Sequence, residues 1–424
     1  MPSLCILNVV GLTPRLLASA PRIAALGRAR PWKSPLPAVT LTSQATMLTG
    51  LAPSGHGIVG NGWLYRDTLE VRFWQQSFSL LQGEPFYAGF RTAKIFWWFN
   101  QGAPVAWSVT PKPHYGCDGS KVFGIIDRTE CNLEARLGPF PFPAFWGPAA
   151  GLASSRWIAH AAALVLEERR PEITLVYLPH LDYDYQRHGP GDPARVAEAD
   201  ACAGIVIDAA RRIGAQVVVV SEYGLVPVSK PVYINRALRR EGWLAVRDGP
   251  FGEMLDTFGS EAFAVADHQL AHVYLRGAPV EEVRRVLEGL EGVDRVAEPR
   301  ELELDHPRSG ELVALARPDA WFAYPYWLDD ARAPDFAPTV DIHRKPGYDP
   351  CELFMTSKAR ALFRLAQKKL GFRYRMDIVP LDASRVRGSH GLRPAPEDGP
   401  LVLGPGEPPD DMRGFKEYVR RLLR

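Results

Sequence analysis

The stretch that decides the fold runs from Pro37 to Trp63 and reads P-A-V-T-L-T-S-Q-A-T-M-L-T-G-L-A-P-S-G-H-G-I-V-G-N-G-W. A short apolar run leads into Thr40 and Thr42, and the helix-like segment that follows stops at Gly50. Threonine favours the start of a helix and glycine its end. A helix start offers free N–H groups and the positive end of the helix dipole, so this hydroxyl-bearing turn could bind a phosphate. The alternative is a capped helix followed by a glycine-rich loop.

Length and composition indicate a well-packed globular protein. The chain has 424 residues, of which 46% are apolar and 23% charged. The net charge of +2 argues against nucleic acid as a main partner. Five scattered cysteines without a C-x-x-C pair suit reduced thiols, so we expect a cytoplasmic location. No stretch reaches the roughly 18 uninterrupted apolar residues of a membrane helix, so we expect no membrane partner.

Periodicity along the chain predicts a parallel α/β fold. Apolar runs at 4–10, 173–178 and 217–220 read as buried strands, with helices expected over 154–170 and 193–213. We therefore predict a three-layer α/β/α sandwich with a mostly parallel central sheet, formed by residues 1–392. Residues 277–318 read as β-α-β pieces and predict a small inserted α+β subdomain. Residues 393–424 predict a Pro/Gly-rich tail that ends in a short helix.

The opening stretch resembles the nucleophile segment of the nucleotide pyrophosphatase/phosphodiesterase branch of the alkaline phosphatase superfamily. That segment reads roughly P-x-x-T-x-P-N-H-x-x-x-V-T-G-x-x-P-x-x-H-G-I-x-x-N. Counting back from Thr49 and Gly50 places the nucleophile of that family on Thr40. Asn61 matches the final asparagine, and we expect it to bind the substrate. The Pro-Asn-His of the family pattern is replaced here by residues 42–44, T-S-Q.

Three later segments resemble the metal-binding motifs of the same family, with substitutions. P-H-L-D-Y-D-Y-Q-R-H-G-P resembles D-x-x-G-H-x-x-G-P, S-E-Y-G resembles S-D-H-G, and S-R-V-R-G-S-H-G resembles G-x-H-G. In the first strand, the I-D-G-L of the family reads V-V-G-L, so Val10 stands where an aspartate ligand is expected. The resemblance implies a divalent metal, for which we expect zinc, at one site rather than two. The ligand positions fall on Asp182, Gln186, Glu222 and His390, with His268, Asp341 and His343 as candidate replacements.

The resemblance implies a metal-dependent phosphoric-ester hydrolase, similar to a phosphodiesterase or nucleotide pyrophosphatase, that acts on a small phosphorylated substrate. Thr40 would be the nucleophile and Glu222 or Tyr223 the general base. Because several ligand positions are substituted, the alternative is a catalytically impaired member that binds phosphoryl ligands without turnover.

Basic and aromatic residues elsewhere are candidates for substrate binding. Lys112 falls in a polar, turn-rich segment that predicts a loop. Arg344 and Lys345 lie beside a carboxylate and an imidazole, which suits a phosphate site as well as a solvated surface. Trp97 and Trp98 could line a substrate pocket or fill the core.

Overall fold

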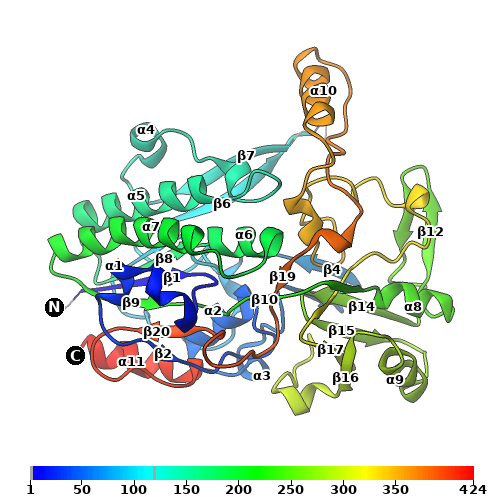
Figure 1. The fold of residues 1–424 in the computed structure, drawn as a ribbon, viewed down its shortest axis with the longest axis horizontal. Helices are drawn as coiled ribbons and strands as arrows, with labels where there is room; N and C mark the ends of the chain where they lie inside the picture. Colours follow the sequence, from blue (N-terminus) through cyan, green and yellow to red (C-terminus); the bar gives the residue numbers. More distant parts are fainter. Residues whose placement is uncertain (1–2, 118–120) are drawn as a thin grey trace.

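The computed structural model describes residues 3–117 and 121–424, and its largest element is an eight-stranded sheet (Figure 1). The strand order is β2-β20-β9-β1-β8-β5-β6-β7. Neighbours from β9 to β6 pair in parallel, whereas β2, β20 and β7 are joined antiparallel at the edges. The strands are β1 Leu4–Val9, β2 Arg30–Pro31, β5 Thr92–Ile95, β6 Trp107–Tyr115, β7 Lys121–Asp127, β8 Ile173–Leu178, β9 Gln216–Val220 and β20 Leu401–Leu403.

Strand β1 shows why helices cover both faces of this sheet. All six of its residues are buried. Cys5, Leu7 and Val9 share a core with α5 and α7, while Leu4 and Ile6 point to the other face and share a core with α2 and α11. These helices are α2 Thr40–Thr49, α5 Leu152–Arg169, α7 Pro193–Arg212 and α11 Phe415–Leu422. The predicted α/β/α sandwich with a mostly parallel sheet is confirmed.

A second, four-stranded antiparallel sheet lies beside the first, on the right in Figure 1. Its order is β14-β15-β17-β16, and residues 277–318 supply two of these strands together with α9. That 277–318 is a separate inserted unit, and 393–424 a separate tail, stays a prediction. The elements are α8 Ile234–Arg240, β14 Ala262–Asp267, β15 Leu270–Leu275, α9 Val280–Glu288, β16 Val293–Ala297 and β17 Leu312–Ala316.

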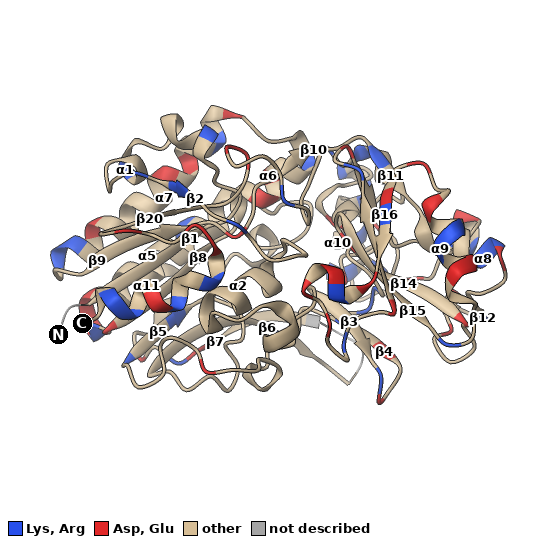
Figure 2. Cartoon of the chain, turned by 90° about the horizontal axis from the view of Figure 1, so that it is seen from below, with Lys and Arg blue, Asp and Glu red and all other residues tan. Residues whose placement is uncertain are grey.

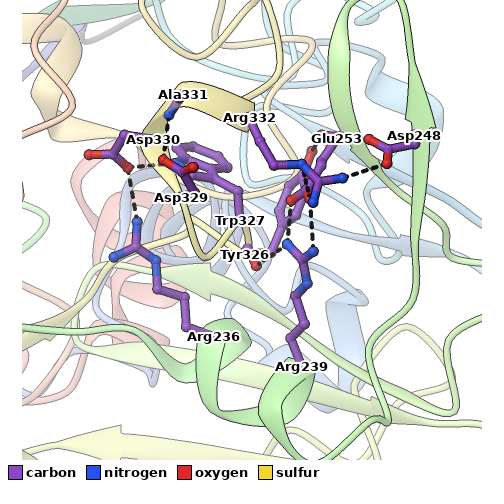
Figure 3. Close-up of polar contacts among 10 residues, drawn as sticks. All are labelled: Arg236, Arg239, Asp248, Glu253, Tyr326, Trp327, Asp329, Asp330, Ala331 and Arg332. Carbon is purple, nitrogen blue, oxygen red and sulfur yellow. Dashed lines mark hydrogen bonds and ion pairs between the residues drawn. The ribbon is translucent and has the colours of Figure 1, made fainter.

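A buried carboxylate joins three elements of this second part of the molecule (Figure 3). Glu253 is almost fully buried and accepts hydrogen bonds from the guanidinium of Arg239 on α8. Arg332 lies 3.0 Å from the same carboxylate and also pairs with Asp248. Because a buried charge is costly without partners, these two arginines fix the hairpin of β12 Val246–Gly249 and β13 Gly252–Leu255 against the body.

Two segments that the sequence predicts as loops are regular structure. Lys112 lies within strand β6, which pairs with β7 along seven residues, because ladder pairing overrides the turn preference of its prolines. The ligand-rich segment after β8 forms helix α6, His180–His188, and most of its side chains are buried. The other short elements are α1 Pro21–Ala24, α3 Pro53–His56, β3 Gly62–Tyr65, β4 Glu70–Phe73, α4 Leu133–Leu137, β10 Val226–Pro227, β11 Lys230–Val232, β18 Ala320–Phe322, α10 Lys358–Lys369 and β19 Gly388–Ser389.

The five cysteines, all of which the structure describes, are unpaired. Among the described residues, no helix is long and apolar enough to cross a membrane.

Helix α2 is held by the histidine that follows it. His56 Nδ1 accepts a hydrogen bond from Ile58 N at 3.1 Å, so its Nε2–H donates to Thr46 Oγ1 at 3.0 Å. Thr46 Oγ1 in turn donates to the carbonyl of Thr42 within α2. Burial, with help from the nearby His306 and Arg308, lowers the pKa of His56 to about 3.

We predict that His56 makes the fold sensitive to acid. As pH falls below the ordinary histidine pKa of about 6.5, the unfolded chain takes up a proton at His56 that the folded chain does not, so the free energy of unfolding falls. Wild type should therefore lose about 2 kcal/mol more than His56→Gln between about pH 7 and about pH 4.5 in urea unfolding. The same substitution at exposed His160 is the control. Equal acid losses in wild type and His56→Gln would contradict this account.

Candidate functional site

The segments that resemble the nucleophile and metal-binding motifs of the family meet at the carboxyl ends of β1, β8 and β9. Thr40 is the first residue of α2, Glu222 and Tyr223 follow β9, and Asp182 lies in α6 directly after β8. His390 follows β19, and its Nδ1 donates to the carbonyl of Ala38 at 2.8 Å. This bond brings the last motif of the chain against the start of α2. Parallel α/β sheets bind ligands at this edge.

The Thr40 hydroxyl lies at the centre of this group. Its Oγ1 is 3.1 Å from the Tyr223 hydroxyl, and both side chains are buried. Burial raises the pKa of Tyr177, near the end of β8, well above its ordinary value. The nearby Thr40 side chain lowers the pKa of Tyr177 in part. Burial also raises the pKa of Tyr223 well above its ordinary value, so its phenol is protonated at neutral pH. Thr40 therefore faces neutral hydroxyl groups at the start of a helix.

Glu222 is buried behind Thr40 and is held by two side-chain amides. Its Oε1 accepts from Asn8 Nδ2 at 2.6 Å and from Gln44 Nε2, while Oε2 has no hydrogen-bond partner among the described residues. Burial raises the pKa of Glu222 to about 8, and the hydrogen bonds from Gln44, Asn8 and Thr40 oppose that rise. The carboxyl is thus largely protonated near neutral pH.

Asp182 is paired with Gln186 one helical turn later. Gln186 Nε2 donates to Asp182 Oδ2 at 2.8 Å, and Gln186 Oε1 accepts from the Tyr348 hydroxyl at 2.7 Å. Burial raises the pKa of Asp182 to about 7. The amide oxygen of Gln186, the atom a metal would need, is therefore occupied by Tyr348.

Four aromatic rings form a continuous stack beside these carboxyls. Tyr223 stacks on His390 with 3.6 Å between ring centroids, His390 lies 3.6 Å from His268, and His268 stacks on Tyr348 at 3.8 Å. All four side chains are buried. Burial lowers the pKa of His390 to about 3 and that of His268 well below its ordinary value. Because His390 Nδ1 donates to the carbonyl of Ala38, the lone pair of the ring is on Nε2. His390 Nε2 lies 3.5 Å from Asp182 Oδ1.

A cavity of about 370 Å³ adjoins this site. Its wall includes Trp74, Trp98 and Trp146, three glutamines and Lys112, and its lining contains no Asp or Glu among the described residues. Gln44 connects the wall to the site, because it bonds Glu222 and also accepts from the backbone N–H of Trp98 at 2.9 Å. The rings of Trp74 and Trp146 contact Tyr348. The volume suits a small organic group.

A comparison of the sequence with protein-family models shows which family the chain belongs to. The model described as type I phosphodiesterase / nucleotide pyrophosphatase matches residues 4–349. The chain belongs to this family, within the alkaline phosphatase superfamily. A comparison with curated protein sequences finds no match.

Solved structures share the fold of this phosphodiesterase-family chain. Phosphonoacetate hydrolase from Sinorhizobium meliloti 1021, in complex with phosphonoformate, has a TM-score of 0.61 at 18% identity, covering 100% of this chain and 96% of that one. The same hydrolase with phosphonoacetate has a TM-score of 0.61 at 20% identity, with the same coverage. Murine ectonucleotide pyrophosphatase / phosphodiesterase 5 has a TM-score of 0.59 at 14% identity, covering 99% and 95%.

The donor atoms of this family member fit one divalent ion better than two. In the part of the chain that the structure describes, no three or more His, Cys, Asp or Glu side chains are placed to hold a metal. Among the predicted ligand positions, Val10 offers no donor atom, the Tyr223 phenol is protonated and the Glu222 carboxyl is largely protonated. Two donor atoms are left, namely Asp182 Oδ1, which has no hydrogen-bond partner among the described residues, and His390 Nε2. Carboxylate and imidazole together suit zinc.

The candidate replacement ligands do not complete this site. His268 lies against His390 with the ring planes tilted by 36° and the centroids 3.6 Å apart, so it packs against the His390 ring, whereas a metal binds in the plane of an imidazole. His343 lines the cavity, with its Nδ1 3.4 Å from the carbonyl of Phe73. The backbone N–H of Asp341 donates to Glu352 at 2.8 Å. Neither is placed beside Asp182 and His390.

The residues predicted to bind the substrate lie in different places in the structure. Lys112 lines the cavity. Asn61 accepts from Leu41 N in the first turn of α2 and donates to Asp267, so it positions the helix start. Arg344 is half exposed and pairs with Asp335.

The Lys345 side chain is buried and binds other residues of the protein. Its ammonium donates to the carbonyl of Thr339 at 2.9 Å and lies 2.7 Å from both Asp349 and Glu352. These three partners take the three protons of the ammonium, which leaves none for a phosphate.

Sequence reasoning missed the amides and tyrosines that complete the site. Asn8 was detectable as the one polar side chain in an otherwise apolar strand. Gln44 could be noticed only as a departure from the family pattern. Tyr177 and Tyr348 carry no local signal, because their roles depend on contacts with residues far along the chain.

Proposed function

We propose that this chain hydrolyses a phosphate ester or phosphoanhydride bond of a small substrate, with Thr40 as the nucleophile. The observation that carries the proposal is the position of Thr40 at the start of α2, with its hydroxyl 3.1 Å from that of Tyr223. A helix N-terminus favours the negative charge that develops on a phosphoryl group. Membership of the phosphodiesterase family supports the reaction class.

The proton of Thr40 has a path away from the reacting atoms. Burial raises the pKa of Asp182, and the nearby Gln186 and Tyr223 side chains lower it, so the Tyr223 hydroxyl lies between Thr40 and Asp182. As Thr40 Oγ1 attacks phosphorus, its proton passes to Tyr223, which gives its own proton to Asp182. With a pKa of about 7, Asp182 is partly ionised at neutral pH and accepts it. The structure favours Asp182 for this task over Glu222, which is largely protonated.

The reaction then closes in two balanced steps. The Thr40–phosphorus bond forms while the bond from phosphorus to the ester oxygen breaks, and the leaving group takes a proton from water or an acid in the site. Water next attacks the phosphothreonine, and the bond from phosphorus to Thr40 Oγ1 breaks as the new oxygen–phosphorus bond forms. Thr40 regains its proton from Asp182 through Tyr223, and the proton lost by the water leaves with the phosphate product. Glu222, protonated beside Thr40, can donate a hydrogen bond to a phosphoryl oxygen. Asp182 does not accept the proton and bind a metal at once, so the proton path above applies to the site without a bound ion; in the loaded site Asp182 and His390 would hold one zinc ion, which would supply positive charge near those oxygens.

The cavity is the proposed site for the organic group of the substrate. It adjoins the site through Gln44 and Tyr348, and its aromatic and amide lining suits a neutral or anionic organic group. Two of the structural neighbours are described with small phosphorus-containing ligands, phosphonoformate and AMP, which supports a small ligand here. The second candidate function is phosphoryl-ligand binding without turnover, which the substituted ligand positions favour.

The nucleophile is tested by substitution at Thr40. Thr40→Ser keeps a hydroxyl and should retain measurable hydrolysis of nitrophenyl phosphate mono- or diesters, while Thr40→Ala should lose about 100-fold or more. Thr42→Ala is the matched control, because Thr42 is a buried neighbouring hydroxyl without a hydrogen-bond partner in the described part of the chain. Equal activity of Thr40→Ala and wild type would refute the assignment. No hydrolysis by wild type with zinc, manganese or magnesium would favour the binding-protein alternative.

The cavity is tested by shortening Trp98. Trp98→Ala removes an aromatic wall but keeps the backbone N–H that holds Gln44, so it should raise KM for bis(nitrophenyl) phosphate about tenfold with little change in kcat. KM for methyl nitrophenyl phosphate, whose second group is small, should change much less. Trp98→Phe keeps a ring and serves as the matched variant, with thermal unfolding as the check on folding. Equal changes for both substrates would count against the cavity as a subsite.

A further inference from the structure

A basic segment projects from the body of the protein. We call residues 357–376 the basic hairpin; it consists of α10 and the chain that returns from it, and it stands clear of the other elements in Figure 1. None of the α10 residues is buried. Of the fourteen large apolar side chains that are exposed in the described part of the chain, six lie here. They are Leu362, Phe363, Leu365, Leu370, Phe372 and Tyr374.

The polar side of α10 is the side held by the protein. Arg360 and Arg364 both bond to Asp377, with Nη2 of Arg360 2.7 Å and Nε of Arg364 2.8 Å from the carboxylate. Leu362 and Leu365 lie away from this pair on the helix and are 67% and 48% exposed, and Phe363, whose ring lies under the Arg364 guanidinium, is 58% exposed. A surface helix of a globular protein normally buries its apolar side. Here that side is turned to solvent.

The hairpin also concentrates positive charge. Residues 357–376 contain no Asp or Glu and seven cations, namely Lys358, Arg360, Arg364, Lys368, Lys369, Arg373 and Arg375. Three of them, Arg360, Arg364 and Arg375, pair with Asp377 just beyond the hairpin, which leaves Lys358, Lys368, Lys369 and Arg373 outside this pairing. Removing these seven from the 50 Lys and Arg of the chain leaves 43 against 48 Asp and Glu, a net charge of −5 for the remainder. Elsewhere, basic and acidic residues are interspersed (Figure 2). The charge of the hairpin is therefore a local feature.

We propose that the basic hairpin docks on an anionic membrane surface, with its leucine and aromatic side chains in the headgroup region and its lysines and arginines on lipid phosphates. Basic residues combined with exposed Leu and Phe on a short helix are the features of interfacial binding. A twelve-residue helix spans about 18 Å, well short of the roughly 30 Å hydrocarbon core, so the hairpin lies on the bilayer and does not cross it.

Charge complementarity favours an anionic membrane over a second copy of the chain as the partner of the basic hairpin. Two hairpins of the same strongly positive charge repel each other when they meet. The hairpin is also a projecting element without a groove, which suits insertion into a soft interface. The proposal does not depend on the proposed hydrolysis.

Vesicle flotation of the full chain tests the proposal. Wild type should float with phosphatidylcholine vesicles that contain phosphatidylglycerol, much less with phosphatidylcholine alone, and less as salt is raised. The double variants Leu362→Ser/Phe363→Ser and Lys368→Glu/Lys369→Glu should each weaken binding about tenfold or more.

Matched controls carry the same substitutions at exposed sites outside the hairpin. Phe251→Ser/Phe258→Ser and Arg247→Glu/Arg300→Glu should float like wild type, and thermal unfolding should be equal for all variants. Failure of wild type to bind anionic vesicles would overturn the proposal, as would hairpin variants that bind as well as wild type. Light scattering that shows a wild-type dimer lost in the hairpin variants, without vesicle binding, would assign the surface to a second copy.

Discussion

Three carboxyl groups are buried in and beside the candidate site without a Lys or Arg ion-pair partner among the described residues: Asp182, Glu222 and Asp267. Side-chain amides surround them instead. Gln186 donates to Asp182, Asn8 and Gln44 donate to Glu222, and Asn61 donates to Asp267. Neutral amides offset the cost of burying a carboxyl only in part, and burial raises the three pKa values to about 7, 8 and 7.

Because no Lys or Arg pairs with these three carboxyl groups, side-chain amides hold them and also connect them to the rest of the site. The amides that hold the carboxyls also fix other parts: Asn61 holds the first turn of α2, Gln44 reaches the cavity wall, and Gln186 reaches Tyr348. The proposed proton transfer through Tyr223 to Asp182 belongs to the site without a bound ion, in which Asp182 is neither fully ionised nor fully protonated near neutral pH. A divalent ion on Asp182 and His390 would favour the ionised carboxyl, so metal binding and proton release are coupled here.

Motif spacing and the positions of the apolar runs were sufficient to predict the fold and to predict that Thr40, Asp182 and Glu222 lie near one another. Thr40, Asp182 and Glu222 each follow an apolar run, and the carboxyl ends of parallel strands meet at one edge, so their proximity could be predicted. The stack of Tyr223, His390, His268 and Tyr348 could not, because each of its contacts joins residues at least 80 positions apart in the chain. Lys345 looked like a phosphate ligand, yet Asp349 and Glu352, four and seven residues later, fold back onto it. Whether a charged run faces solvent or itself depends on such local turns.

The central claim is that a phosphoryl group binds at Thr40 in a site that holds at most one metal ion. Crystallography of the protein with orthovanadate and zinc, with anomalous scattering to locate the zinc, tests both parts directly. The account predicts vanadium bonded to Thr40 Oγ1 and no more than one zinc, beside Asp182 and His390. Vanadate bound away from Thr40, or two fully occupied zinc sites, would contradict it.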